Sequence, residues 1–110
     1  MKEIRISSDA LSDLNEGFLL YEQQAPGIGD YFSSSLRADI EELKVTGGGH
    51  RVIFRQFHRS LSRMFPYGIF YTVKDHSVIV YAVVDLRRDP EFIRRHLEET
   101  KAQPCEDHNG

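Results

Sequence analysis

The chain has 110 residues, a formal net charge of −3 and 40% hydrophobic residues, a composition typical of one soluble globular domain. No apolar run approaches the roughly 18–20 residues needed to span a membrane, and we expect no signal peptide. The single cysteine, Cys105, excludes a disulfide framework, and the five histidines lack the spacing of a zinc site. We therefore expect a cytoplasmic protein without a metal or another cofactor.

Charged residues are unevenly distributed along the chain. Residues 1–46 carry four Lys/Arg and nine Asp/Glu, residues 47–97 carry nine and four, and residues 98–110 carry one and four. An arginine-rich block thus lies between two acidic segments. This asymmetry favours a polyanion or an acidic protein as a partner, although arginines that only solvate one face of a sheet give the same pattern.

The N-terminal residues predict a strand followed by a helix. Residues 2–7, "KEIRIS", alternate between apolar and polar side chains, as a short strand does. Ser7 or Ser8 is then a suitable N-cap for a helix over residues 8–24. The apolar stripe expected on this helix consists of Leu11, Leu14, Phe18 and Tyr21.

A second helix follows after a short turn. The turn "APGIG" contains Pro26, which cannot continue a helix, and two glycines that permit a tight change of direction. The helix starts near Asp30 and ends at "TGGG", residues 46–49. Its apolar face consists of Phe32, Leu36, Ile40 and Leu43. We expect the two helices to form a hairpin that packs on a sheet.

Three strands are predicted next, over residues 59–65, 67–73 and 77–86. The first two alternate, whereas the third is almost continuously apolar, which is typical of a central strand covered on both faces. The polar residues "KDHS" between the last two predict a hairpin. Pro66 cannot donate to a ladder, so we expect it at a corner between strands. We expect the strand aromatics to pack in the core: Tyr67, Phe70, Tyr71 and Tyr81.

The C-terminal part predicts one more helix and a tail. Asp89 and Pro90 form a plausible cap and first turn for a helix of about residues 90–99. The fold class is therefore α+β, in the order β-α-α-β-β-β-α, with a mainly antiparallel sheet and a helical hairpin on one face. We assign the domain to residues 1–99 and a flexible acidic tail to residues 100–110.

Four segments of the sequence resemble the RelE/ParE superfamily of bacterial toxins from type II toxin–antitoxin modules, and are most similar to its ParE-like plasmid-stabilisation branch. They lie within residues 1–97 and read "ALSDL", "YEQQAPGIGDYF", "RSLSRMFPYGIFYTV" and "VVDLRRDP". The resemblance implies a small antiparallel sheet with a helical hairpin. It also implies a cognate antitoxin protein that wraps and neutralises the toxin.

The resemblance leaves two activities open, because RelE-like members cleave mRNA in the ribosomal decoding site whereas ParE-like members bind and inhibit DNA gyrase. The nuclease would use cations at three matching positions: Arg59, Arg63 and Arg88. However, Gly68 stands where RelE carries a strand arginine, Arg94 stands where it carries a tyrosine, and residues 58–66 contain no lysine. Arginine is a poor acid or base, which leaves His58 or His96 to transfer a proton.

The ParE-like interpretation needs no catalytic set, only a surface that docks on gyrase. Candidate target-binding residues are Arg59, Arg63, Arg87, Arg88 and Arg94. We expect Arg59 and Arg63 about 7 Å apart on one face of a strand. Arg87 and Arg88 would point to opposite faces, and Arg88 would alternatively pair with Asp85 or Asp89. We therefore predict a ParE-like gyrase inhibitor, with an mRNA endoribonuclease or a toxin-fold module without toxicity as alternatives. We expect no membrane partner and no sequence-specific DNA binding.

Overall fold

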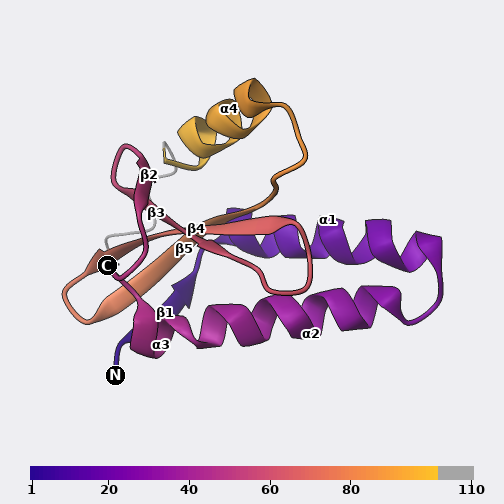
Figure 1. The fold of residues 1–110 in the computed structure, drawn as a ribbon, viewed down its shortest axis with the longest axis horizontal. Helices are drawn as coiled ribbons and strands as arrows, with labels where there is room; N and C mark the ends of the chain where they lie inside the picture. The colour runs from indigo at the N-terminus through magenta and orange to yellow at the C-terminus, as the bar shows by residue number, and fades with distance from the viewer. Residues whose placement is uncertain (102–110) are drawn as a thin grey trace.

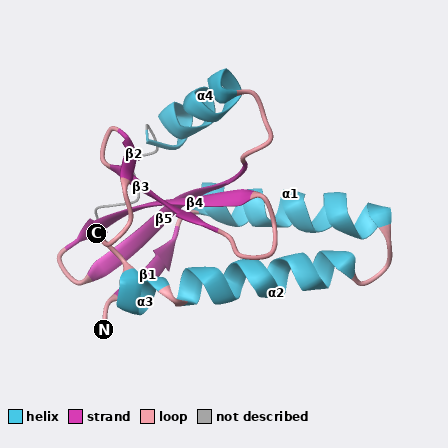
Figure 2. Cartoon of the chain, in the orientation of Figure 1, coloured by secondary structure: helices cyan, strands magenta, loops and turns pink. Residues whose placement is uncertain are grey.

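The computed structural model describes residues 1–101, which form one sheet with helices on both faces (Figures 1 and 2). The elements in chain order are β1 (Glu3–Ile6), α1 (Ser8–Gln24), α2 (Ile28–Glu41), α3 (Leu43–Thr46), β2 (Val52–Phe54), β3 (Phe57–Leu61), β4 (Tyr67–Lys74), β5 (Ser77–Asp85) and α4 (Pro90–Lys101). The predicted α+β class is confirmed. Helix α4 ends two residues later than expected, and the rest of the predicted tail lies outside the described residues.

The five strands lie in the order β1-β5-β4-β3-β2, so β5 and β4 are central. All neighbouring pairs are antiparallel except β1 and β5, which are parallel. The α1–α2 hairpin covers one face of the sheet, and α4 covers the other (Figure 1). Each face has its own apolar core, and these we call the hairpin-side core and the α4-side core. The four strand aromatics that we expected in the core are all buried.

The helical hairpin is closed by side-chain bonds to backbone groups at its ends. The Ala10 N–H donates to Ser7 Oγ (3.0 Å), which confirms Ser7 as the N-cap of α1. The Glu22 carboxylate accepts the N–H groups of Gly27 (3.1 Å) and Gly29 (2.9 Å), so a side chain of α1 satisfies donors at the start of α2. Gly27 has φ 91°, which favours glycine at this position.

The buried face of α1 is rotated relative to the predicted stripe. Leu11, which we placed in the core, is 45% exposed, so this prediction is wrong. The buried residues of α1 are Ala10, Asp13, Leu14 and Gly17. A Cβ atom at Gly17 would overlap the ring of Phe32, so this glycine allows α1 and α2 to approach each other closely. Apolar periodicity missed this face because two of its four members are a glycine and an aspartate.

Strand β5 contains a β-bulge that changes which face its side chains occupy. Tyr71 of β4 pairs with Val80, and Phe70 pairs with Ala82, so Tyr81 is the extra residue. Val80 belongs to the hairpin-side core, whereas Ala82 belongs to the α4-side core. Because both of its faces are covered, β5 is apolar almost throughout and supplies both cores.

Two details of the β region differ from the prediction. The first predicted strand, residues 59–65, is β3 and covers 57–61, and β2 (Val52–Phe54) was not foreseen. Residues 62–66 instead form the corner that leads into β4, where the N–H of Ser62 donates to the carbonyl of Tyr67 (2.9 Å). The Pro66 carbonyl accepts the N–H of Leu86 (2.9 Å), which fixes this corner to the residue that follows β5. The expected corner at Pro66 is confirmed.

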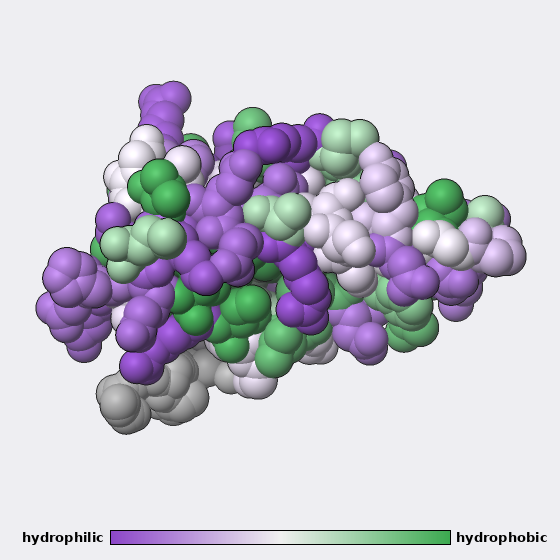
Figure 3. Space-filling view, turned by 90° about the horizontal axis from the view of Figure 1, so that it is seen from below, coloured by the Kyte–Doolittle hydropathy of each residue, from purple (hydrophilic) through white to green (hydrophobic). Residues whose placement is uncertain are grey.

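The described part of the chain has no helix that is both long and apolar enough to cross a membrane. Figure 3 shows the face seen from below in Figure 1, where hydrophilic residues surround separate apolar groups. The large apolar side chains that remain exposed come from several elements, including α1, β2 and the corner after β3.

We predict that Gly17→Ala destabilises the fold. A methyl group here would overlap the buried Phe32 ring, so overpacking costs roughly 2–3 kcal/mol, and the better helix propensity of alanine offsets about 1 kcal/mol of this. Urea unfolding should show a net loss of about 1–2 kcal/mol. Ser12→Ala, on the exposed face of the same helix, should stay within about 0.5 kcal/mol of wild type. An unchanged midpoint for Gly17→Ala would show that the hairpin has room at this contact.

Candidate functional site

Arg59 lies in β3 on the α4 side of the sheet, opposite Phe70. All ten arginines of the chain lie within residues 1–101, and Arg59 is the only one that is half-buried, since the other nine are exposed. Its aliphatic stem passes close to Gly68, where a Cβ atom would lie 3.3 Å from Arg59 Cδ and 3.1 Å from Leu86 Cδ2. Within residues 1–101 no carboxylate pairs with its guanidinium.

Arg63 does not share a strand face with Arg59, so that expectation is wrong. Strand β3 ends at Leu61, and Arg63 lies in the corner that follows. Its guanidinium forms an ion pair with Glu42, at the junction of α2 and α3. The backbone N–H of Arg63 donates to the Asp39 carboxylate of α2 (3.3 Å). The same carboxylate accepts a hydrogen bond from the Ser62 hydroxyl (2.8 Å). Arg63 therefore attaches the corner to the helices.

Arg87 and Arg88 both follow β5, which ends at Asp85, so they do not alternate across a strand as we expected. It is Arg87, and not Arg88, that pairs with Asp85, through Nε (3.0 Å) and Nη2 (2.8 Å). These hydrogen bonds lower the pKa of Asp85. Burial, together with the nearby Asp85 carboxylate, raises the pKa of Tyr67 to about 12, so the phenol keeps its proton at neutral pH.

Arg88 and Arg94 belong to the region of α4. The Arg88 guanidinium carbon lies 3.7 Å from the centre of the Phe92 ring, a cation–π contact at the start of the helix. Arg94 pairs with Glu91 and with Glu98 (3.5 Å) on the surface of α4. The five predicted target-binding arginines are thus spread over β3, the corner after it, the end of β5 and α4. Their role in binding a target stays a prediction.

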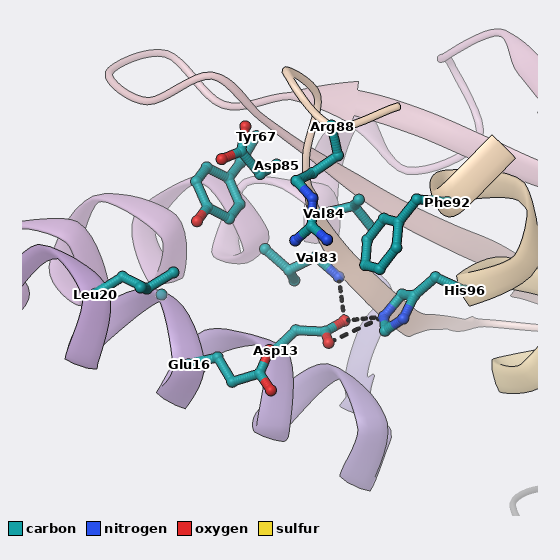
Figure 4. Close-up of a pocket in the computed structure, with 11 residues that line it drawn as sticks. Asp13, Glu16, Leu20, Tyr67, Val83, Val84, Asp85, Arg88, Phe92 and His96 are labelled. Carbon is teal, nitrogen blue, oxygen red and sulfur yellow. Dashed lines mark hydrogen bonds and ion pairs between the residues drawn. The ribbon is translucent and has the colours of Figure 1, made fainter. Parts of the chain in front are cut away.

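A small cavity of about 70 Å³ lies between α1, the end of β5 and α4 (Figure 4). Asp13, a buried residue of α1, accepts the N–H of Val83 (2.9 Å) and the Nε2–H of His96 (3.0 Å). One carboxylate therefore joins α1, β5 and α4. This site was missed because an aspartate at a helical position does not by itself reveal a distant partner, although its place beside Ala10 and Leu14 was the available signal.

The Asp13–His96 pair can hold a proton inside the fold. Hydrogen bonding to Asp13 raises the pKa of His96, and the more distant Asp9 and Glu99 act in the same direction against the effect of burial. The His96 ring also stacks on Phe92, 5.9 Å between centroids. His96 and Arg88 line the same cavity, which the sequence could not establish. Three carboxylates line it too, and they disfavour binding of a phosphate: Asp13, Glu16 and Asp85.

His58, the other candidate for proton transfer, lies in a separate cluster on β3 and β4. Its ring stacks on Tyr71, 5.0 Å between centroids, and its Nδ1–H donates to the carbonyl of His50 (2.7 Å). The Tyr71 hydroxyl accepts the N–H of Gly48 (3.0 Å) and bonds to His50 Nδ1 (2.6 Å). These contacts connect the loop before β2 to the sheet. No group of three or more potential metal-ligating residues occurs in the described chain.

We predict that His96 makes stability depend on pH. Because the folded-state pKa of His96 is raised, its bond to Asp13 contributes fully below the unfolded value of about 6.5 and is lost as pH rises through the higher folded value. The stability difference between wild type and His96→Gln, measured by urea unfolding, should shrink as pH increases across this window. Asn15→Ala, an exposed position of α1 without a titratable side chain, should give a difference that does not change with pH. A flat profile for His96→Gln would contradict the assignment.

Comparisons with known proteins place this geometry in a known fold. No family model matches the chain, and no curated protein matches it. Among solved structures, it is similar to a chain from the chromosomal ParDE toxin–antitoxin system of P. aeruginosa, with a TM-score of 0.72 and 12% sequence identity. The match covers 77% of this chain and 96% of that chain. The chain therefore has the ParE/RelE-like fold that its sequence motifs predicted.

Proposed function

We propose that this chain is the toxin of a type II toxin–antitoxin module, that it acts in the bacterial cytoplasm, and that it is neutralised by a cognate antitoxin. The observation that carries this proposal is the structural likeness to a ParDE chain, which extends over almost all of that chain. In the ParE-like version that we favour, the toxin inhibits DNA gyrase by binding it and catalyses no reaction.

The positions of the arginines favour binding over RNA cleavage. Of the three arginines that would serve a nuclease, Arg63 is held by Glu42 and Arg88 lies on the Phe92 ring. The Asp13–His96 pair, the best-placed group for proton transfer, lines a cavity that is rich in carboxylates. A phosphodiester would be repelled there, because its charge has the same sign as that of the lining.

We predict that induced expression in bacteria stops DNA synthesis first. Incorporation of thymidine should fall while incorporation of methionine continues, because gyrase inhibition blocks replication before translation. In the purified system, the chain should inhibit supercoiling of relaxed plasmid by gyrase and leave relaxation by topoisomerase I unchanged. If methionine incorporation fell first, the chain would be an mRNA endoribonuclease. If neither fell, it would be a toxin-fold module without toxicity.

The antitoxin is expected to stabilise the toxin by mass action. A partner that binds only the folded state adds about 2.7 kcal/mol at 100 times its Kd, which raises Tm by roughly 10 °C or more in a domain of this size. The product of the reading frame next to this gene is the natural candidate. Its co-expression should restore growth, and its addition should raise the toxin's Tm. A neighbouring product that restores growth without binding would contradict a type II module.

A further inference from the structure

Arg59 combines two properties that no other arginine of the chain combines. It is half-buried, and within residues 1–101 its guanidinium has no carboxylate partner. Four other arginines each have at least one carboxylate, namely Arg55, Arg63, Arg87 and Arg94. Removing a cation partly from water without pairing it costs free energy. A partner that supplies an anion at this point would recover that cost.

The surroundings hold the Arg59 side chain flat on the sheet. Leu61 of β3 pairs directly with Gly68 of β4, and Leu86 approaches Gly68 from the side of β5. Because Gly68 has no side chain, the stem of Arg59 and the side chain of Leu86 lie over its Cα. Leu61, on the same face as Arg59, is 58% exposed. The stem of Arg59 and the side chain of Leu86 thus meet over Gly68, and Leu61 is the next residue of β3 on the same face.

We propose that Arg59, Leu61 and Leu86, which we call the Arg59 surface, bind a carboxylate side chain flanked by apolar residues on a partner protein. Gly68 is a positioning residue, because any Cβ atom at 68 would displace the Arg59 stem or Leu86. The proposal deepens the proposed function, on which it rests for the identity of the partner: this surface is the part of the toxin that contacts its protein target.

The chemistry of this surface favours a protein over a nucleic acid. A nucleic acid is bound by several cations that follow its phosphates. Here Arg59 has Leu86 beside its stem, and Arg63 is already paired with Glu42. One further cation, the exposed Arg51, lies opposite Arg59 across β3. Two neighbouring cations beside apolar side chains do not form the row that follows a phosphate backbone. Arginine is enriched among the few residues, in desolvated positions, that carry most of the affinity in protein interfaces. A guanidinium also binds a carboxylate through two parallel hydrogen bonds, and a stem that is already positioned loses less freedom on binding.

The first test uses the full chain and defined probes, without gyrase. The backbone amides, the Arg59 Nε–H and the leucine methyl groups would be followed by NMR during titration with a capped leucine–glutamate–leucine peptide. We expect saturable shifts at Arg59, Leu61 and Leu86, and none with the leucine–glutamine–leucine peptide. Equal responses to both peptides, or no response, would overturn the proposal. A stronger response to a uridine oligonucleotide than to the glutamate peptide would do so as well.

Variants separate the charge from the scaffold. Arg59→Gln should weaken binding of the glutamate peptide roughly tenfold or more. Arg37→Gln changes an exposed arginine of α2 that forms no ion pair within residues 1–101, and it should leave binding unchanged. Gly68→Ala should weaken it several-fold although Arg59 is intact. If Gly68→Ala does not fold, as judged by its amide spectrum, Leu86→Ala replaces it, because this change removes the other wall. Wild-type affinity in both Arg59→Gln and the scaffold variant would overturn the assignment.

A further control addresses the acidic residues of the chain's own C-terminus. If the full chain responds to the peptide only after Glu106→Gln and Asp107→Asn are introduced together, the chain's own carboxylates occupy the surface and the proposal is wrong.

The gyrase assay then distinguishes this proposal from the proposed function. If wild type inhibits gyrase, Arg59→Gln should raise the inhibitory concentration roughly tenfold or more and Arg37→Gln should not. An unchanged inhibitory concentration for Arg59→Gln would overturn the surface and leave the function intact. If wild type does not inhibit gyrase but the peptide titration succeeds, the function fails and the Arg59 surface stands.

Discussion

The bulge at Tyr81 is the constraint on which both faces of the sheet depend. In a regular strand, Val80 and Ala82 would lie on the same face of the sheet. The α4-side core would then lose Ala82. The extra residue reverses the alternation of β5, so that Ala82 and Val84 pack under α4 while Val83 faces the hairpin. The same strand thus supplies the hairpin-side core with Val78, Val80 and Val83, and the α4-side core with Tyr81, Ala82 and Val84.

Asp13 satisfies a backbone N–H group of β5 that lies beyond the end of β1. Strand β1 pairs with β5 only as far as Val80, which leaves the later N–H groups on that edge without a strand partner. Helix α1 crosses this edge, and Asp13 accepts the Val83 N–H that would otherwise be buried without a bond. A buried carboxylate in turn requires further partners, and His96 supplies one. This hydrogen bond, together with the burial of Leu97 in the α4-side core, positions α4.

The sequence was sufficient for the elements with strong local signals and insufficient where partners are distant. Helix α1 and the corner at Pro66 were predicted from caps and from proline, which act locally. The bulge could not be predicted, because a continuously apolar strand has no alternation to interrupt. Strand β2 has three residues, too few for a periodic pattern. Glu42, the partner of Arg63, lies 21 residues earlier in the sequence. The sequence alone therefore could not predict this ion pair.

The pairing of arginines changes what the charge asymmetry of the sequence means. The arginine-rich block suggested a polyanion, yet Arg63 is neutralised by Glu42 from the acidic front half, and Arg87 and Arg94 are neutralised by carboxylates beside them in sequence. Much of the positive charge is therefore used to hold corners and helix ends in place. The half-buried Arg59, which has no carboxylate partner within residues 1–101, has Leu86 beside its stem and Leu61 on the same face of β3. Such a surface discriminates by shape and by one matched charge, which suits recognition of a folded protein better than attraction to a phosphate backbone.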